Sequence, residues 1–147
     1  MRITVNKKEF QNKLEQIKKI VPNRSNFPVL ECCLIVAKNG NAYLKATDFD
    51  TTMKLLINAE IVEEGAVCVN CKKIRDIVKQ LKQESFTITK LDEERTAIEF
   101  GNTKLIVDGK HVDEYPVVED FDNVEKIRIK KDEFLNAIKS VSHAMAK

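Results

Sequence analysis

Residues 2–17 read RITVNKKEFQNKLEQI, and the spacing of their apolar side chains changes in the middle of the stretch. Ile3 and Val5 are two residues apart, as side chains on one face of a strand are. The next three apolar residues, which begin at Phe10 and end at Ile17, follow the spacing i, i+4, i+7 of one helix face. The stretch therefore predicts a short strand that runs directly into an amphipathic helix over residues 7–21.

The same spacing occurs twice more, so the chain contains an internal repeat. Residues 66–69 precede a second helix pattern over 72–82, and residues 126–129 precede a third over 131–145. The matched positions are Ile3, Val5, Phe10, Leu14 and Ile17, then Val67, Val69, Ile74, Val78 and Leu81, then Ile127, Ile129, Phe134, Ile138 and Val141. Each copy predicts a strand followed by a helix.

Three strand patterns follow each of the first two helix patterns. They cover residues 29–38, 42–47 and 52–61, then residues 85–91, 96–100 and 103–107. Turn residues separate them, at Asn39-Gly40-Asn41, Asp48-Phe49-Asp50, Asp92-Glu93-Glu94 and Gly101-Asn102. We therefore expect an α+β fold of two β-α-β-β-β units that share a core, with the helices on one side and antiparallel sheets outside.

The third copy has its strand and helix patterns, but three further strand patterns do not follow within the 147 residues. We expect residues 1–121 to form one domain and residues 122–147 to contribute the first strand and helix of a second, truncated domain. The acidic segment 111–123, which contains Tyr115-Pro116, has the character of the linker between them.

Composition indicates a soluble globular protein, with 43% hydrophobic and 33% charged residues. No apolar run approaches the roughly 20 residues that span a bilayer, and the N-terminus lacks the apolar segment of a secretion signal. We expect a cytoplasmic protein without membrane contact. The net charge of +2 neither favours nor excludes nucleic acid as a partner.

Basic residues are concentrated in the first two helix patterns. Segments 7–24 and 71–83 hold 11 of the 25 basic residues and only 3 of the 23 acidic ones. At 100° per residue, Lys8 and Lys19 lie opposite the first apolar stripe, and Lys72 and Lys79 opposite the second. A single basic helix is usually a solvated face. Two basic helices in one repeat favour a surface for the phosphate backbone of a duplex, without base readout.

The four cysteines are expected to be structural thiols. Cys68 and Cys71 have the spacing of half a zinc site, but Cys32 and Cys33 are adjacent and do not supply the usual second pair. Cys68 also lies within a strand pattern. We therefore predict no metal site and no cofactor.

Four segments resemble motifs of the bacterial DNA polymerase III beta subunits, and their order and spacing hold over the whole chain. Residues 22–30, PNRSNFPVL, resemble the family's R-x-T-x-P-I-L loop, and residues 42–50, AYLKATDFD, resemble its L-x-L-x-x-T-D-L-E segment. Residues 65–73 resemble the strand that leads into its second helix, although Asn70-Cys71 replaces the usual Pro-Ala. Glu114-Tyr115-Pro116 resembles the motif before its domain junction.

The resemblance implies a DNA-clamp fold and a homodimeric ring that encircles double-stranded DNA as a polymerase processivity factor. It implies that Arg24 and Lys72 contact DNA, and that Leu105 and Val107 lie at the subunit interface. The replicative polymerase and the clamp loader would be further partners. Their peptide pocket lies between domains that are absent from this chain, so no residue here is assigned to it.

Two other classes of function fit the sequence less well. An enzyme is not expected, because the chain contains no glycine-rich phosphate loop, nucleophile elbow or metal cluster. Asp48 and Asp50 could be imagined as metal ligands, but a strand-to-strand turn capped by aspartate is much commoner. A small nucleic-acid-binding or assembly module is the second alternative, although RNA-binding sheets carry aromatic residues on their strand faces.

Overall fold

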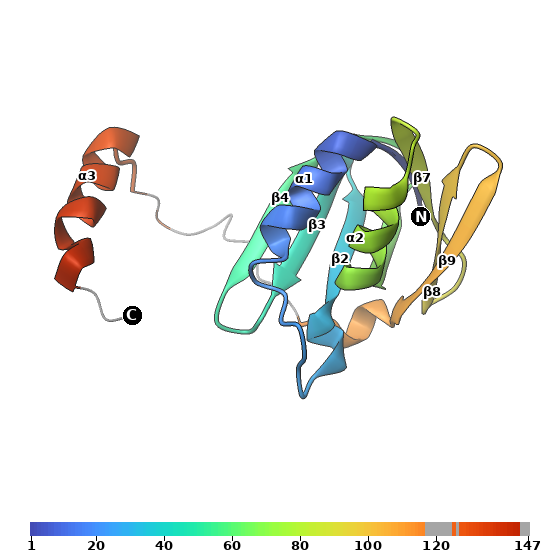
Figure 1. Ribbon diagram of the computed structural model, residues 1–147, viewed down its shortest axis with the longest axis horizontal. Helices are drawn as coiled ribbons and strands as arrows, with labels where there is room; N and C mark the ends of the chain where they lie inside the picture. The colour runs from blue at the N-terminus through green and yellow to red at the C-terminus, as the bar shows by residue number, and fades with distance from the viewer. Residues whose placement is uncertain (117–124, 126, 145–147) are drawn as a thin grey trace.

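The computed structural model describes residues 1–116, 125 and 127–144 (Figure 1). The helices are α1 (Lys7–Ile17), α2 (Cys71–Gln80) and α3 (Lys131–Val141), and the 3-10 helices are η1 (Pro28–Glu31), η2 (Val112–Glu114) and η3 (Ser142–Ala144). The strands are β1 (Arg2–Asn6), β2 (Cys32–Lys38), β3 (Asn41–Thr47), β4 (Thr52–Ile57), β5 (Ala59–Glu63), β6 (Gly65–Asn70), β7 (Ser85–Lys90), β8 (Arg95–Phe100) and β9 (Thr103–Lys110).

The strands form one antiparallel arrangement in the order β4-β3-β2-β6-β9-β8-β7-β1-β5. The first strand of each repeat joins the strands of the other repeat, since β1 pairs with β7 and β6 pairs with β2. The two β-α-β-β-β units predicted from the sequence are therefore interlocked. Neither unit can be removed without taking a strand from the sheet of the other.

Both helices of the N-terminal body, α1 and α2, lie side by side over the same face of the strands, as predicted (Figure 1). All ten apolar repeat positions of the first two copies are buried where these helices pack on the strands. Phe10 of α1 meets Phe86 of β7 edge to face, with 5.5 Å between ring centroids. Because α1 packs on a strand of the second repeat, the two repeats share one core.

Several element boundaries differ from the sequence prediction. The first helix ends at Ile17 and not near residue 21, because the amides of Lys19 and Ile20 bond to carbonyls three residues back and tighten the last turn. Lys19 therefore lies in the turn after α1. Residues 28–31 form η1, so β2 begins only at Cys32.

The predicted turn between β2 and β3 is confirmed. Asn39 and Gly40 have φ angles of 53° and 72°, which suits a two-residue hairpin turn with positive φ at both central positions.

Strand β9 is longer than predicted and pairs with two strands, first with β8 and then with β6. It pairs with β8 as far as Asp108, and then Gly109 and Lys110 pair with Val69 and Cys68 of β6. A Cβ atom on Gly109 would lie 1.7 Å from the carbonyl oxygen of Cys68. The close approach of β9 to β6 therefore requires glycine at this position.

The third repeat copy forms its helix but not its strand. Residues 127–130 have no strand structure, and the five apolar repeat positions of this copy are between 42% and 86% exposed. The described residues offer these positions no partner strand. The predicted boundary near residue 121 lies outside the described residues, so the domain division stays a prediction. Within the described ranges, no helix is long and apolar enough to cross a membrane.

Candidate nucleic-acid interface

The basic helix face consists of Lys8, Lys72 and Lys79, together with Lys19 and Arg24 in the segment after α1. All five side chains are exposed, while the apolar side of each helix is buried. Because α1 and α2 are neighbours on one side of the sheet, their lysines belong to one side of the molecule (Figure 1).

Asparagine side chains begin both helices at equivalent repeat positions. Asn6 Oδ1 accepts a hydrogen bond from the amide of Glu9 at 3.1 Å, and Asn70 Oδ1 accepts one from the amide of Lys73 at 3.0 Å. Asn70 departs from the family motif, yet it caps α2 as Asn6 caps α1. The cap fixes the first turn of α2, which carries Lys72.

The segment that carries Arg24 lies against the start of α2. A hollow of about 70 Å³ is lined by side chains from both, among them Asn23, Lys72 and Arg75. The amide of Ser25 donates to Glu31 Oε1 at 3.2 Å, which ties the segment to η1. The structure thus brings the neighbourhood of Arg24 to Lys72, as the predicted DNA surface requires.

Ion pairs neutralise part of this surface. Lys79 Nζ lies 3.0 Å from Glu15 Oε1, and Lys73 Nζ lies 3.1 Å from Asp108 Oδ2. Lys7 Nζ donates to the carbonyl oxygen of Leu81 and so joins the start of α1 to the end of α2. No sequence pattern predicts these contacts, because they depend on how α2 packs against α1 and β9.

The proposed interface strand carries two exposed apolar side chains. Leu105 is 38% exposed and Ile106 is 55% exposed, whereas Val107 is only 1% exposed and packs in the main core. The expectation that Val107 contacts another subunit is therefore corrected: its side chain is already covered by its own chain. The interface as a whole stays a prediction.

The cysteines of the C-x-x-C pair lie in different clusters. Cys71 belongs to the main core with Cys33, and Cys68 belongs to a smaller cluster with Cys32 and Tyr115. A hydrogen bond with Cys71, together with burial, raises the pKa of the Cys33 thiol. This placement separates the two thiols that a zinc half-site would bring together.

The turn at residues 48–50 uses its aspartate as a cap, as predicted. Asp48 Oδ1 accepts a hydrogen bond from the amide of Thr51 at 2.7 Å. Phe49, at the centre of the turn, has a φ of 76° and is 58% exposed. Its ring contacts that of Phe27, a pairing that sequence analysis missed because the two loops are far apart along the chain.

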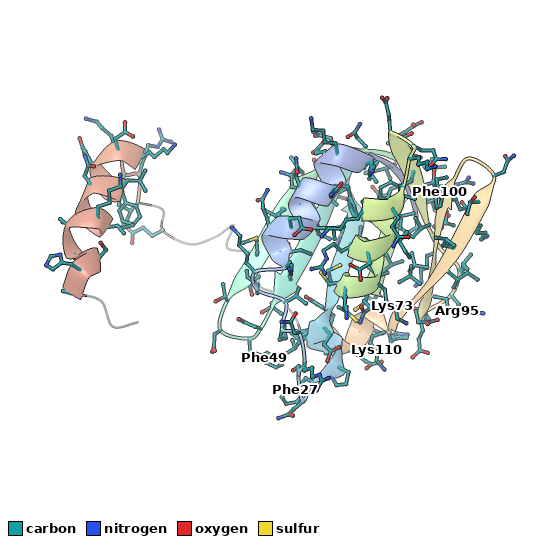
Figure 2. The ribbon with its side chains drawn as sticks, in the orientation of Figure 1. Phe27, Phe49, Lys73, Arg95, Phe100 and Lys110 are labelled. Atoms are coloured by element: carbon teal, nitrogen blue, oxygen red, sulfur yellow. The ribbon has the colours of Figure 1, made fainter. Side chains whose placement is uncertain are left out.

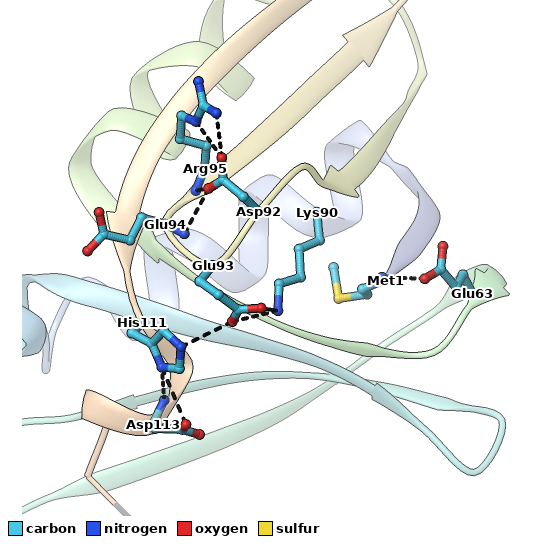
Figure 3. Close-up of polar contacts among 9 residues, drawn as sticks. All are labelled: Met1, Glu63, Lys90, Asp92, Glu93, Glu94, Arg95, His111 and Asp113. Atoms are coloured by element: carbon cyan, nitrogen blue, oxygen red, sulfur yellow. Dashed lines mark hydrogen bonds and ion pairs between the residues drawn. The ribbon is translucent and has the colours of Figure 1, made fainter.

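A polar network that has no signal in the sequence ties the linker segment to the turn between β7 and β8 (Figure 3). His111 Nε2 lies 3.4 Å from Glu93 Oε2, and Glu93 in turn accepts from Lys90 Nζ at 2.8 Å. His111 Nδ1 accepts from the amide of Asp113 at 3.3 Å. The network holds the start of η2 against the turn between β7 and β8.

Comparison with known proteins agrees with this architecture. The whole chain aligns with 40% of the length of the beta sliding clamp of Chlamydia pneumoniae, at 22% identity. The DNA polymerase sliding clamp from Bacillus subtilis superposes with a TM-score of 0.85 at 23% identity, over 95% of this chain and 39% of that one. The Helicobacter pylori beta clamp bound to a DNA ligase peptide superposes with a TM-score of 0.87 at 22% identity, over 99% of this chain and 41% of that one.

The chain thus spans about two fifths of the length of the relatives it matches. Residues 1–119 match the family model described as DNA polymerase III beta subunit, N-terminal domain. That match covers the interlocked repeats, both basic helices and the loop that carries Arg24. The chain therefore belongs to the DNA polymerase III beta subunit family, of which it contains the N-terminal domain.

Proposed function

We propose that this chain is part of a sliding clamp subunit that encircles duplex DNA without sequence specificity and keeps a replicative polymerase on its template. The observation that carries the proposal is the pairing of two basic helices on one face of a continuous sheet. The sheet supports the helices, and the helices present positive charge to the phosphate backbone. Such a subunit has no catalytic role and needs no cofactor.

The chemistry of the basic helix face suits a contact that slides. Arg24, Lys8, Lys19, Lys72 and Lys79 would meet phosphates as charges on long flexible side chains. Contacts to phosphate position a protein on DNA but carry no sequence information. Exchange of one phosphate for the next therefore costs little, and the protein can move along the duplex.

Assembly into a ring would use the free edge of β9. Thr103 to Ile106 pair only with β8 among the described strands, and Leu105 and Ile106 leave apolar surface beside that edge. An exposed edge strand with apolar side chains is suited to pairing with another chain. We propose this edge as the homodimer contact, with Leu105 retained from the sequence prediction.

The remaining partners follow from the proposed role. A clamp binds double-stranded DNA, the replicative polymerase and a clamp loader, and it works in the cytoplasm. The solved Helicobacter pylori clamp is bound to a DNA ligase peptide, which shows one peptide partner for that relative. We further propose that residues 122–147 begin a second clamp domain.

Salt dependence of duplex binding tests the proposal. The variants Arg24→Glu and Lys72→Glu should each weaken binding to a blunt duplex and lower the slope of log affinity against log salt by about one unit. Lys38→Glu is the control, because it changes the net charge by the same amount and Lys38 is exposed at the end of β2. An equal loss in the control would refute a contact surface on α1 and α2.

A further inference from the structure

An exposed pair of aromatic rings stands beside the loop of Arg24. Phe27 and Phe49 meet edge to face, with 5.5 Å between ring centroids and 89° between ring planes (Figure 2). The residues are 57% and 58% exposed. They come from two loops, the segment between α1 and β2 and the turn between β3 and β4.

The turn that carries Phe49 is held rigidly in an unfavourable conformation. A φ of 76° places a bulky residue in the left-handed region, which side chains with a Cβ atom rarely adopt. Thr47 Oγ1 accepts from the amide of Phe49 at 3.1 Å and donates to the carbonyl of Thr51 at 3.0 Å. These bonds keep the ring in solvent, where an apolar side chain gains nothing for folding.

The loop that carries Phe27 is ordered by its own hydrogen bonds. The amide of Phe27 donates to Ser25 Oγ at 3.0 Å, and the carbonyl of Phe27 accepts from the amide of Leu30 at 3.0 Å. Arg24 lies in the same loop and is exposed. The two rings and the guanidinium are therefore presented by two short, internally bonded loops.

The size and surroundings of the ring pair decide what it can bind. Three of the four chain neighbours of the rings are polar, namely Asn26, Asp48 and Asp50, and Pro28 is the fourth. The apolar surface is therefore much smaller than the roughly 1,000 Å² that a stable protein interface requires. A nucleobase needs only one or two ring faces, and aromatic rings beside basic residues are the usual composition of single-strand binding sites.

We propose that Phe27 and Phe49 form a stacking site for an unpaired DNA base at the end of the basic helix face. The inference rests on the proposed function, since it places the site where a bound duplex would leave the helices. Arg24 holds the phosphate of the stacked nucleotide. Asp50 repels a backbone on its own side, so the site accepts one or two bases and not a long strand.

The test uses this chain with two probes at low salt. One is a blunt duplex, and the other is the same duplex with a short thymidine overhang that contains one 2-aminopurine. Stacking on a ring should quench the 2-aminopurine, and the overhang should raise affinity over the blunt duplex. Phe49→Gly and Phe27→Leu should each lower overhang affinity about tenfold and leave blunt-duplex affinity unchanged.

Matched variants separate stacking from loss of structure. Phe49→Gly should leave the melting temperature unchanged or raise it, because glycine adopts a φ of 76° without steric strain. Asp50→Asn should strengthen overhang binding. Val62→Ala removes an equally exposed apolar side chain from β5 and should change nothing.

Each outcome can be assigned to one proposal. If the overhang gives no quenching, or if Phe49→Gly binds both probes as the unaltered chain does, the stacking site is refuted. In that case the proposed function still stands wherever Lys72→Glu weakens blunt-duplex binding. If the overhang binds through the rings while Lys72→Glu leaves the blunt duplex unaffected, the stacking site stands and the clamp surface fails.

Discussion

Lys79 Nζ lies 3.0 Å from Glu15 Oε1, and this ion pair joins α2 to α1 on the surface proposed to face DNA. The hydrogen bond from Lys79 holds the pKa of Glu15 below its ordinary value. The pair therefore stabilises the helix packing above the ordinary glutamate pKa, and this contribution is lost as pH falls through the lowered pKa. Both side chains are more than a third exposed, so solvent screens the attraction.

The same pair limits what Lys79 can offer to a phosphate. Glu15→Gln should release the lysine and increase duplex affinity, with a rise of up to about one unit in the salt slope. Lys79→Ala should then cost more affinity in the Glu15→Gln background than in the unaltered chain. The control is Glu94→Gln, an exposed carboxylate in the turn between β7 and β8. An identical gain from Glu94→Gln would show that only net charge matters.

The helix caps should contribute equally to stability. Asn6→Ala and Asn70→Ala each remove a side-chain acceptor from a helix N-terminus and should lower the free energy of unfolding by about 1 kcal/mol. Asn12 is exposed within α1 and is the matched control, since alanine favours a helix at that position. Urea unfolding followed by circular dichroism measures all three. A loss for Asn12→Ala as large as that for the caps would contradict the assignment.

Gly109 should be the least replaceable glycine in the N-terminal body. Gly109→Ala places a Cβ atom 1.7 Å from the carbonyl oxygen of Cys68, so β9 cannot pair with β6 without backbone movement. Gly40→Ala meets no atom within 4 Å and should cost only about 1 kcal/mol for its positive φ. Thermal unfolding should show a much larger drop for Gly109→Ala. Similar melting temperatures for the two variants would disprove the close approach of β9 to β6.

Matched positions of the repeat should respond differently to truncation. Val78 is fully buried on the inner face of α2, whereas Ile138, at the same position of the third copy, is 42% exposed. Val78→Ala should destabilise the N-terminal body by about 2 kcal/mol through lost burial and a cavity. Ile138→Ala should change the unfolding of that body by less than about 0.5 kcal/mol. Denaturant titration of both variants decides the point.

The apolar stripe of α3 should drive association between copies. Phe134, Ile138 and Val141 are all more than 40% exposed, and each would gain about 1.5–3 kcal/mol if it were fully buried. Light scattering should show concentration-dependent association for the chain and a monomer for a version that ends near residue 120. Phe134→Ser with Ile138→Ser should abolish the association. A monomeric chain at high concentration would refute this packing.

The sequence by itself determined the local structure of the repeats. Spacing alone identified the strand and helix of the first two copies and the helix of the third, and Asn39-Gly40 marked a hairpin turn. It also showed which face of each helix would be apolar and which basic. These features follow from the period of each element and from residues with special backbone freedom, and both act within a few neighbouring positions.

Only the tertiary structure decided which strands meet and which apolar residues are covered. Side chains alternate with a period of two in every strand, so no sequence pattern shows that β1 pairs with β7, a strand of the other repeat. The third copy carries the same apolar spacing as the first two, yet Val78 is buried and Ile138 is not. Burial depends on partners that are distant in sequence. For the same reason, the contacts of Lys79 with Glu15 and of Phe27 with Phe49 became visible only in the folded chain.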